Sequence, residues 1–557
     1  MKTNWKAIAV AAAVLLNGGV LAGCGGGDSQ TTGGDVPEIG VWGPEYSQNY
    51  PAGKQTDPVM AKIESTLGIS LNVETHPTEE KFNVLLASGS LPDMVMTKKS
   101  YASRMIEGET VIPLDPYLEE SGKDIKQNAP ESVAFSQKYL SNDTNQLYFL
   151  PTAIDPGVPN PIVGMFFRWD YYEELGCPEI TSDEEFIDVV AQMYQKHPVN
   201  EDGEAYIPFS PWFDWDIWAY TMYPSFMEAK AFSINGLYQC DRATGEISSM
   251  LEDDGIIWRG AKFWNMVNQK GLLDPDALTQ KYETAIQKGS TNRVLAAQAI
   301  WQNRDSNQLL AQGGTSDKGY ASVPIPMTGA KYMFKSPNEI GSLDRMWAVT
   351  KNAKNPQKCV ELLNYLFSYD GANTIINGIE GTNYTKDESG KRKYTPEHLE
   401  ITKTNANWVG ETGVTKYQNW CGISPNFVMT DINESVYIQN IEETKNNMSD
   451  VDRALCEFYN VELPSELVPK NSEIIEDQTV VPFALMPETP DDIKRIDDKI
   501  LNYLKSNLTK LIFAESDAEF AQIQQQIVNE VKAMDYDTSY NFYYTEYQKA
   551  LEQSKSF

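Results

Sequence analysis

The sequence has 557 residues, more than one hydrophobic core usually organises, so we expect two or more domains. Hydrophobic residues make up 41% of the chain and aromatic residues 11%, which is ample for globular folding. The 78 acidic side chains outnumber the 46 basic ones. This negative charge disfavours nucleic-acid binding, because it repels phosphate backbones, and it suits a water-facing protein with a neutral ligand.

Cysteine and histidine are both rare. The six cysteines contain no C-x-x-C pair, and the three histidines form no metal-binding spacing. Apart from Cys24, the five cysteines are scattered and odd in number, so no disulfide framework is indicated, although a single bridge stays open. We therefore expect no cofactor, no metal and no histidine-based catalysis.

The N-terminus has the pattern of an export signal. Residues 1–23 begin with Lys2 and Lys6 and continue with a short apolar run that is too interrupted to span a membrane. Residues 24–35 start at Cys24 and form a flexible linker rich in Gly, Ser and Thr. We expect the folded part to begin at about residue 36.

The first expected elements alternate between strands and helices. A strand at 37–43 that ends in Trp42, a helix at 57–67 and a strand at 69–74 precede a helix that Thr78 can cap and Gly89 can end. The apolar residues 94–96 then indicate a buried strand. In an open α/β sheet, ligands collect past the carboxyl ends of the strands. The residues at two strand ends are therefore ligand-binding candidates: Trp42, Thr97, Lys98, Ser100 and Tyr101. The alternatives are a core position for Trp42 and an ordinary surface loop for the other four.

Residues 209–218 have an unusual aromatic composition. Three tryptophans alternate with Asp214 and Asp216 in this segment. Flat rings stack on the C–H faces of sugars, and carboxylates accept hydrogen bonds from sugar hydroxyls. We interpret Trp212, Asp214 and Trp215 as a sugar-binding group, with an aromatic core cluster as the alternative.

Several motifs resemble one protein family. The segment ASGSLPD at 87–93 followed by an apolar strand, the lipobox-like Leu21-Ala22-Gly23-Cys24 and the segment GLLDPDAL at 271–278 are similar to the family 1 extracellular solute-binding proteins. These are receptors of carbohydrate ABC importers, and the likeness is to their large lipoprotein members in Gram-positive bacteria. The resemblance implies an α/β, periplasmic-binding-protein-like fold of two lobes joined by a hinge, with a cleft between them.

The resemblance also implies a function. A lipid on Cys24 would hold a monomeric receptor at the outer face of the cell membrane. The receptor would bind a carbohydrate and deliver it to the permease subunits of an ABC transporter without acting as an enzyme. The several tryptophans favour an oligosaccharide as this ligand. Two alternatives are a peptide or signal receptor and, with less support, a surface glycoside hydrolase or lyase.

Further binding candidates follow from this resemblance. The segment VLAAQAIWQN at 294–303 is similar to the one in which relatives carry a ring-stacking tryptophan, and GIEGTNY at 378–384 resembles the GIEGxxY segment of the family. The residues implied in this way are Trp301, Asn303, Arg304, Asp305, Glu380 and Tyr384, with a role in bracing the turn as the alternative for the last two. Trp408, in the less regular region that follows, is a further candidate. Residues 197–203 lie where many relatives have a calcium-site-like loop, but His197 and Val199 occupy positions that should supply oxygen, so we expect this site to be lost.

The domain boundaries are expected to be discontinuous. We assign residues 36–160 and 342–400 to the first lobe, and residues 161–341 and 401–557 to the second. In the second lobe, apolar residues at helical spacing predict a helical tail over 488–557, with Thr489 as its N-cap.

Overall fold

The structure is a computed structural model that describes residues 36–43, 52–74, 78–155, 157, 165–215, 217–220, 230–232, 237–297, 302–303, 306–323, 332–335, 337–405, 407–429, 434–438, 445–446, 448–467 and 473–555. The predicted leader, the linker and Cys24 lie outside these residues. Among the described helices, none combines the length and the apolar character that crossing a bilayer requires.

The first sheet has five strands in the order β2-β1-β3-β13-β4. Strands β1, β2 and β3 are parallel, and β13 runs antiparallel to both β3 and β4. Their apolar side chains are almost fully buried, as expected for a sheet covered on both faces. The bounds are β1 (Glu38–Trp42), β2 (Ser70–Glu74), β3 (Met94–Thr97), β4 (Leu150–Thr152) and β13 (Ser342–Val349).

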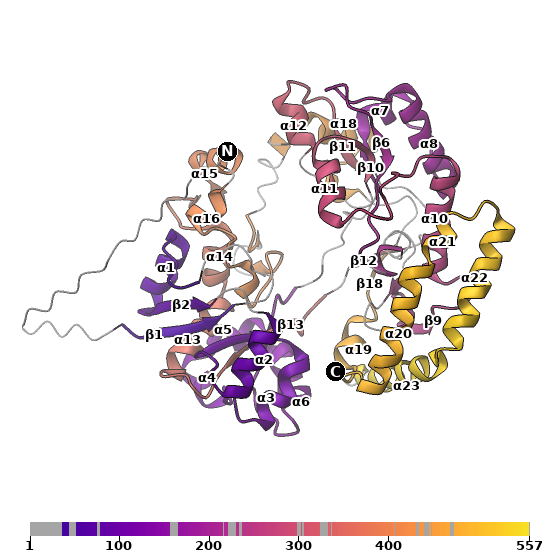
Figure 1. Ribbon diagram of the computed structural model, residues 1–557. Helices are drawn as coiled ribbons and strands as arrows, with labels where there is room; N and C mark the ends of the chain where they lie inside the picture. Colours follow the sequence, from indigo (N-terminus) through magenta and orange to yellow (C-terminus); the bar gives the residue numbers. More distant parts are fainter. Residues whose placement is uncertain are drawn as a thin grey trace, which may run out of the picture. The chain divides into compact units, whose positions relative to one another are not determined.

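Local signals set the helix ends near this sheet. Thr78 caps α2 by accepting a hydrogen bond from the backbone N–H of Lys81, and Gly89 ends the helix in the left-handed conformation with φ 68°. Both predictions are confirmed. The helices of this part, visible around β1, β2 and β13 in Figure 1, are α1 (Pro58–Leu67), α2 (Glu79–Ser88), α3 (Lys99–Glu107), α4 (Asp115–Ser121), α5 (Lys123–Asn128), α6 (Pro130–Tyr139), α13 (Pro356–Leu366) and α14 (Tyr369–Asn377).

The first core takes in a segment that the sequence analysis placed in the second lobe. Val414, Tyr417, Trp420 and Val436 are buried in the same cluster as strands β1–β3, where the Trp347 indole donates a hydrogen bond to the carbonyl of Trp420. We therefore propose that the first lobe extends beyond residue 400 to include this segment. The elements of this region are β14 (Tyr384–Lys386), β15 (Arg392–Tyr394), α15 (Pro396–Thr404), α16 (Trp408–Thr412), η3 (Gln418–Trp420), β16 (Val428–Met429) and β17 (Glu434–Ser435).

The second sheet has four strands in the order β11-β5-β10-β6. Strands β10 and β6 are parallel, whereas β5 is antiparallel to both β10 and β11. The amino ends of β6, β10 and β11 therefore lie at the same edge as the carboxyl end of β5. The bounds are β5 (Met165–Arg168), β6 (Ile207–Phe209), β10 (Val294–Ala297) and β11 (Tyr320–Val323).

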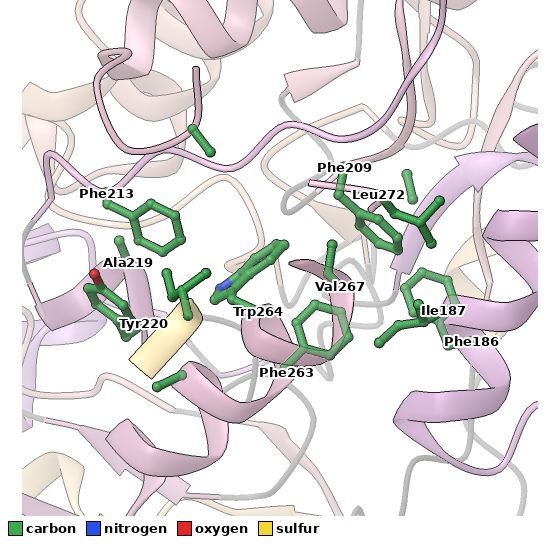
Figure 2. Packing of buried hydrophobic residues seen from close by; sticks show 14 of the residues in the cluster. Phe186, Ile187, Phe209, Phe213, Ala219, Tyr220, Phe263, Trp264, Val267 and Leu272 are labelled. Atoms are coloured by element: carbon green, nitrogen blue, oxygen red, sulfur yellow. The ribbon is translucent and has the colours of Figure 1, made fainter. Parts of the chain in front are cut away.

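An aromatic core lies beside this sheet. Phe209, at the end of β6, and Phe213, four residues later, both contact the Trp264 ring edge-on, at centroid distances of 6.3 and 6.0 Å (Figure 2). Phe213 thereby anchors the segment that follows β6. The helices of this part are α7 (Trp169–Glu174), α8 (Asp183–Lys196), α10 (Ile256–Gln269), α11 (Tyr282–Ser290), α12 (Ser306–Gln312) and α18 (Asp450–Tyr459).

The C-terminal region is helical, as predicted, but its first helix begins differently. Pro490 takes the N-cap position without a side-chain bond, and the Thr489 hydroxyl instead lies 3.3 Å from the Tyr543 hydroxyl. The predicted Thr489 cap is therefore wrong. The remaining elements are η4 (Pro464–Glu466), α19 (Val480–Leu485), α20 (Asp491–Asn507), α21 (Thr509–Ile512), α22 (Asp517–Lys532), α23 (Tyr536–Ser554), β7 (Lys230–Phe232), β8 (Tyr238–Asp241), β9 (Glu246–Ser249), β12 (Tyr332–Lys335) and β18 (Glu473–Glu476).

Candidate functional site

The candidate site lies past the carboxyl ends of β6 and β10, which are neighbours in the second sheet. The two segments that leave these strands are joined, because the side-chain amide of Gln302 donates a 2.7 Å hydrogen bond to the carbonyl of Ser210. Asn303, buried beside it, donates to the carbonyl of Val294 at 2.8 Å. This is the edge of a parallel pair where α/β proteins gather ligands.

A buried polar network holds the segment after β6. The Ser210 hydroxyl donates to Asp274 at 2.5 Å, and Gln280 donates to the Ser210 hydroxyl and to the carbonyl of Pro211. Lys288 completes the network with a 2.7 Å ion pair to Asp274. Burial would raise the pKa of Asp274, but the hydrogen bonds from Lys288 and Ser210 outweigh it and hold this pKa below its ordinary value. The carboxylate therefore stays charged and fixes the start of the aromatic segment.

Four rings form a separate group on this support: Trp212, Trp215, Trp218 and Tyr282. Trp212 is fully buried and contacts both Trp215 and Tyr282 nearly edge-on, each at a centroid distance of 5.3 Å. Trp215 and Tyr282 stack on each other at 4.7 Å and 29°. Trp215, Trp218 and Tyr282 are half-buried. Trp212 therefore supports a layer of rings that keep part of their surface accessible.

Asp214 and Tyr282 are connected through the backbone. Asp214 is exposed, and its carboxylate accepts a hydrogen bond of 3.3 Å from the backbone N–H of Tyr282 at the start of α11. Tyr282 could not be found from the sequence, because it lies 64 positions beyond Trp218, the last of the tryptophans. The polar residues that precede α11 form no sequence pattern that predicts this contact.

The candidates at the first sheet lie in two kinds of surroundings. Trp42 is 2% exposed and packs against Phe82, and Tyr101 is buried with its hydroxyl donating to Glu79 at 2.8 Å. Thr97 is also buried, and its hydroxyl has no partner among the described residues. Lys98 is half-buried at the N-cap of α3, and Ser100 is exposed and lines a pocket of about 710 Å³ together with Lys99.

The other candidates are spread over the chain. Glu380 is exposed and pairs with Lys386 at 3.1 Å, whereas Tyr384 is buried and accepts a hydrogen bond from Asn373. Trp408 is half-buried and packs against the first core. Trp301, Arg304 and Asp305 lie outside the described residues. The structure thus brings together Trp212, Asp214 and Trp215 at one sheet edge, whereas Asn303 is buried against the first residue of β10. The role of these residues in binding stays a prediction.

The charge of Asp274 gives a testable stability effect. We expect Asp274→Asn to lower the free energy of unfolding by about 2 kcal/mol at pH 7, because Lys288 loses its buried partner. The folded-state pKa of Asp274 lies below its unfolded value, so this stabilisation is present above about pH 4 and is lost as the pH falls further. Urea unfolding followed by circular dichroism should show the gap between wild type and variant closing below that pH. Asp276→Asn is the matched control, since Asp276 also contacts Lys288 at 2.9 Å but is 66% exposed. An equal loss in this control would contradict the prediction.

The chain is similar to a known family and to known structures. Residues 64–373, more than half of the chain, match the family model described as bacterial extracellular solute-binding protein. A search of curated protein sequences gives no match.

Three solved structures illustrate the structural likeness. The ABC-transporter substrate-binding protein FusA of S. pneumoniae, an EF-hand mutant in complex with fructo-nystose, is 15% identical with a TM-score of 0.62, over 93% of this chain and 99% of that one. An HMO-binding, ABC-transporter-associated solute-binding protein of Bifidobacterium longum infantis is 14% identical with a TM-score of 0.60, over 92% and 99%. The alginate-binding protein AlgQ2, solved without calcium ion, is 14% identical with a TM-score of 0.55, over 92% and 98%.

These likenesses confirm the predicted fold class, an α/β fold of the two-lobed periplasmic-binding type. They extend over nearly the whole length of the solved chains as well as of this one. The family match implies an extracellular or periplasmic location. The chain belongs to the bacterial extracellular solute-binding proteins.

Proposed function

We propose that this protein binds an oligosaccharide at the carboxyl edge of its second sheet and delivers it to the permease subunits of an ABC transporter. The observation that carries the proposal is the ring layer of Trp215, Trp218 and Tyr282, which rests on buried Trp212 beside the exposed carboxylate of Asp214. A sugar needs both an apolar surface for its C–H face and acceptors for its hydroxyls.

The charge of the chain favours a neutral sugar. With a formal net charge of −32, the protein repels anionic chains such as alginate. The relatives described with fructo-nystose and with HMO make neutral oligosaccharides the first compounds to test. On this proposal, the further candidates for ligand contact are Lys98, Ser100, Trp301, Arg304, Asp305, Glu380 and Trp408. The side chains of Trp42, Thr97, Tyr101 and Tyr384, also predicted as candidates, are buried in the structure.

The proposal includes the attachment of the protein to the membrane. Cys24 follows Leu21-Ala22-Gly23 in a lipobox-like pattern, so the mature receptor starts with a lipid-bearing cysteine and a linker rich in Gly, Ser and Thr. A monomer tethered in this way stays close to its permease at the outer face of the cell membrane. Mass spectrometry of the N-terminal peptide from a bacterial membrane fraction tests this step.

Calorimetric titration of the purified chain tests the ligand class. We expect micromolar or tighter binding of at least one neutral fructo- or milk oligosaccharide. The same titration with a peptide mixture tests whether the protein is instead a peptide receptor. Binding of peptides without binding of sugars would overturn the proposal. An assay of reducing ends after prolonged incubation separates the hydrolase alternative, because a transport receptor leaves the number of reducing ends unchanged.

A further inference from the structure

We propose that the guanidinium of Arg168 is the built-in cation around which residues 197–206 fold, and that the chain therefore needs no calcium ion there. Arg168 is the last residue of β5 and is fully buried. A charge in that position requires partners that replace its hydration. The structure supplies these partners as four side chains from three segments of the chain: Asp170, the pair Glu201 and Tyr206 of the loop, and Asn292.

The guanidinium is saturated by hydrogen bonds. Its Nη2 donates to Asp170 at 2.7 Å and to Glu201 at 2.8 Å, and its Nε donates to Asp170 at 2.9 Å. Nη1 donates to the Tyr206 hydroxyl and to Asn292 at 3.2 Å. All the nitrogens therefore have oxygen partners, and two of these partners are carboxylates that a fork-shaped cation matches well.

These contacts tie the four strands of the second sheet together at one edge. Tyr206 directly precedes β6, Asn292 lies two residues before β10, and Tyr320 opens β11 and donates to Asn292 at 2.8 Å. Because β5 runs antiparallel to β10 and β11, its carboxyl end meets their amino ends. Arg168 is thus at the edge of the sheet opposite to the aromatic group that follows β6.

The loop uses the oxygens that an ion would need. The Asn200 side-chain oxygen accepts from the backbone N–H groups of Asp202 and Glu204, at 3.1 and 2.9 Å. Both Glu201 oxygens are engaged, one by Arg168 and the other by the Asn292 amide at 2.7 Å. Asp202 is exposed, and so is Glu204, which faces Arg293 at 3.5 Å. Calcium takes six or more oxygens, which these residues do not offer together.

The remaining ring of the loop also has partners. His197 stacks on Tyr171 at a centroid distance of 3.8 Å, and its Nε2 contacts Glu174. Lys318 lies 4.0 Å from Glu201, so the carboxylates of Asp170 and Glu201 face two positive groups. A divalent cation placed beside them would be repelled by the positive guanidinium, which its hydrogen bonds hold in place. Among the described residues, no group of three or more His, Cys, Asp or Glu side chains is arranged to hold a metal ion.

Thermal unfolding of the full chain tests the proposal without any sugar. We expect the Tm of the wild type to be the same in EDTA and in millimolar CaCl2, because an ion that does not bind the folded state cannot stabilise it. We expect Arg168→Met to lower the Tm by on the order of 10 °C, because it removes the buried guanidinium that pairs with both Asp170 and Glu201. Arg453→Met is the matched control: Arg453 is half-exposed, pairs with Asp450 at 3.6 Å in the same lobe, and should shift the Tm by about 2 °C or less.

Two results would overturn the proposal. One is a wild-type Tm that falls in EDTA and recovers with CaCl2, which would show a bound ion in the native protein. The other is an Arg168→Met variant that is no less stable than Arg453→Met. If Arg168→Met does not fold, the comparison of EDTA and CaCl2 on the wild type decides the question alone, and it does so independently of whether the ligand is a sugar.

Discussion

Replacing Trp215 by alanine is expected to weaken oligosaccharide binding by about 30-fold, a loss of about 2 kcal/mol. Trp215 is half-buried, stacks on Tyr282 at 4.7 Å and contacts Trp212 edge-on. A sugar can therefore stack on the accessible part of this ring without a rearrangement of the side chains around it. Such preorganisation makes a rigid aromatic residue efficient in binding. Calorimetric titration of wild type and variant with the best oligosaccharide of the panel measures the effect.

Two further variants separate contact from support. Trp215→Phe keeps a flat ring and should retain most of the affinity. Tyr544→Ala removes an aromatic residue of similar size that is 43% exposed on α23, far along the chain from the aromatic group, and should leave affinity unchanged. Equal affinities of Trp215→Ala and Tyr544→Ala would remove Trp215 from the binding site.

Trp212 is expected to behave differently from Trp215. It is fully buried, so its substitution by alanine should first lower the stability of the second lobe and only then the affinity. From the sequence, the two tryptophans are equivalent members of one group. Composition cannot distinguish them, because the burial of each ring depends on α11, which packs against them from a later part of the chain.

The sequence was most informative where structure depends on neighbouring residues. The helix from Thr78 to Gly89 could be predicted at both ends, since a cap needs one oxygen within three residues and an exit needs one glycine. The family likeness then extended these local predictions to the fold. Thr489 shows the limit of local reasoning, because its hydroxyl contacts Tyr543 on a different helix rather than the N–H groups of the next turn.

Long-range packing accounts for the remaining differences. Trp42 ends a strand, as predicted, but β2, β3 and α2 close around it, and sequence pattern alone does not reveal which strand ends stay open. Arg168 gave no signal either, because its partners are spread from Asp170 to Asn292. The burial of Val414, Tyr417 and Trp420 in the first core is of the same kind, since only the fold brings this returning segment back to the first sheet.

The attachment of this returning segment leads to the second large effect. We expect Asp57→Ala to lower the free energy of unfolding by about 3–5 kcal/mol. One oxygen of Asp57 caps α1 by accepting from the backbone N–H of Met60 at 2.9 Å. The other accepts from Lys416 at 2.9 Å and from the Tyr417 hydroxyl at 2.5 Å. The side chains of Asp57 and Lys416 are only 2% and 6% exposed, so the variant loses a cap and leaves a buried ammonium with neutral partners such as Gln55.

A double variant shows which of the two losses dominates. If the unpaired ammonium is the main cost, Asp57→Ala combined with Lys416→Met should be more stable than Asp57→Ala alone, because removing both charges of a buried pair costs less than removing one. If the cap dominates, the double variant should be no more stable, whereas Asp57→Asn, which keeps an oxygen for the Met60 N–H, should recover about 1 kcal/mol. Urea unfolding of the four proteins measures these differences. A single variant as stable as the wild type would show that residues 414–417 are held to α1 by apolar packing of Val414 and Tyr417 rather than by this carboxylate.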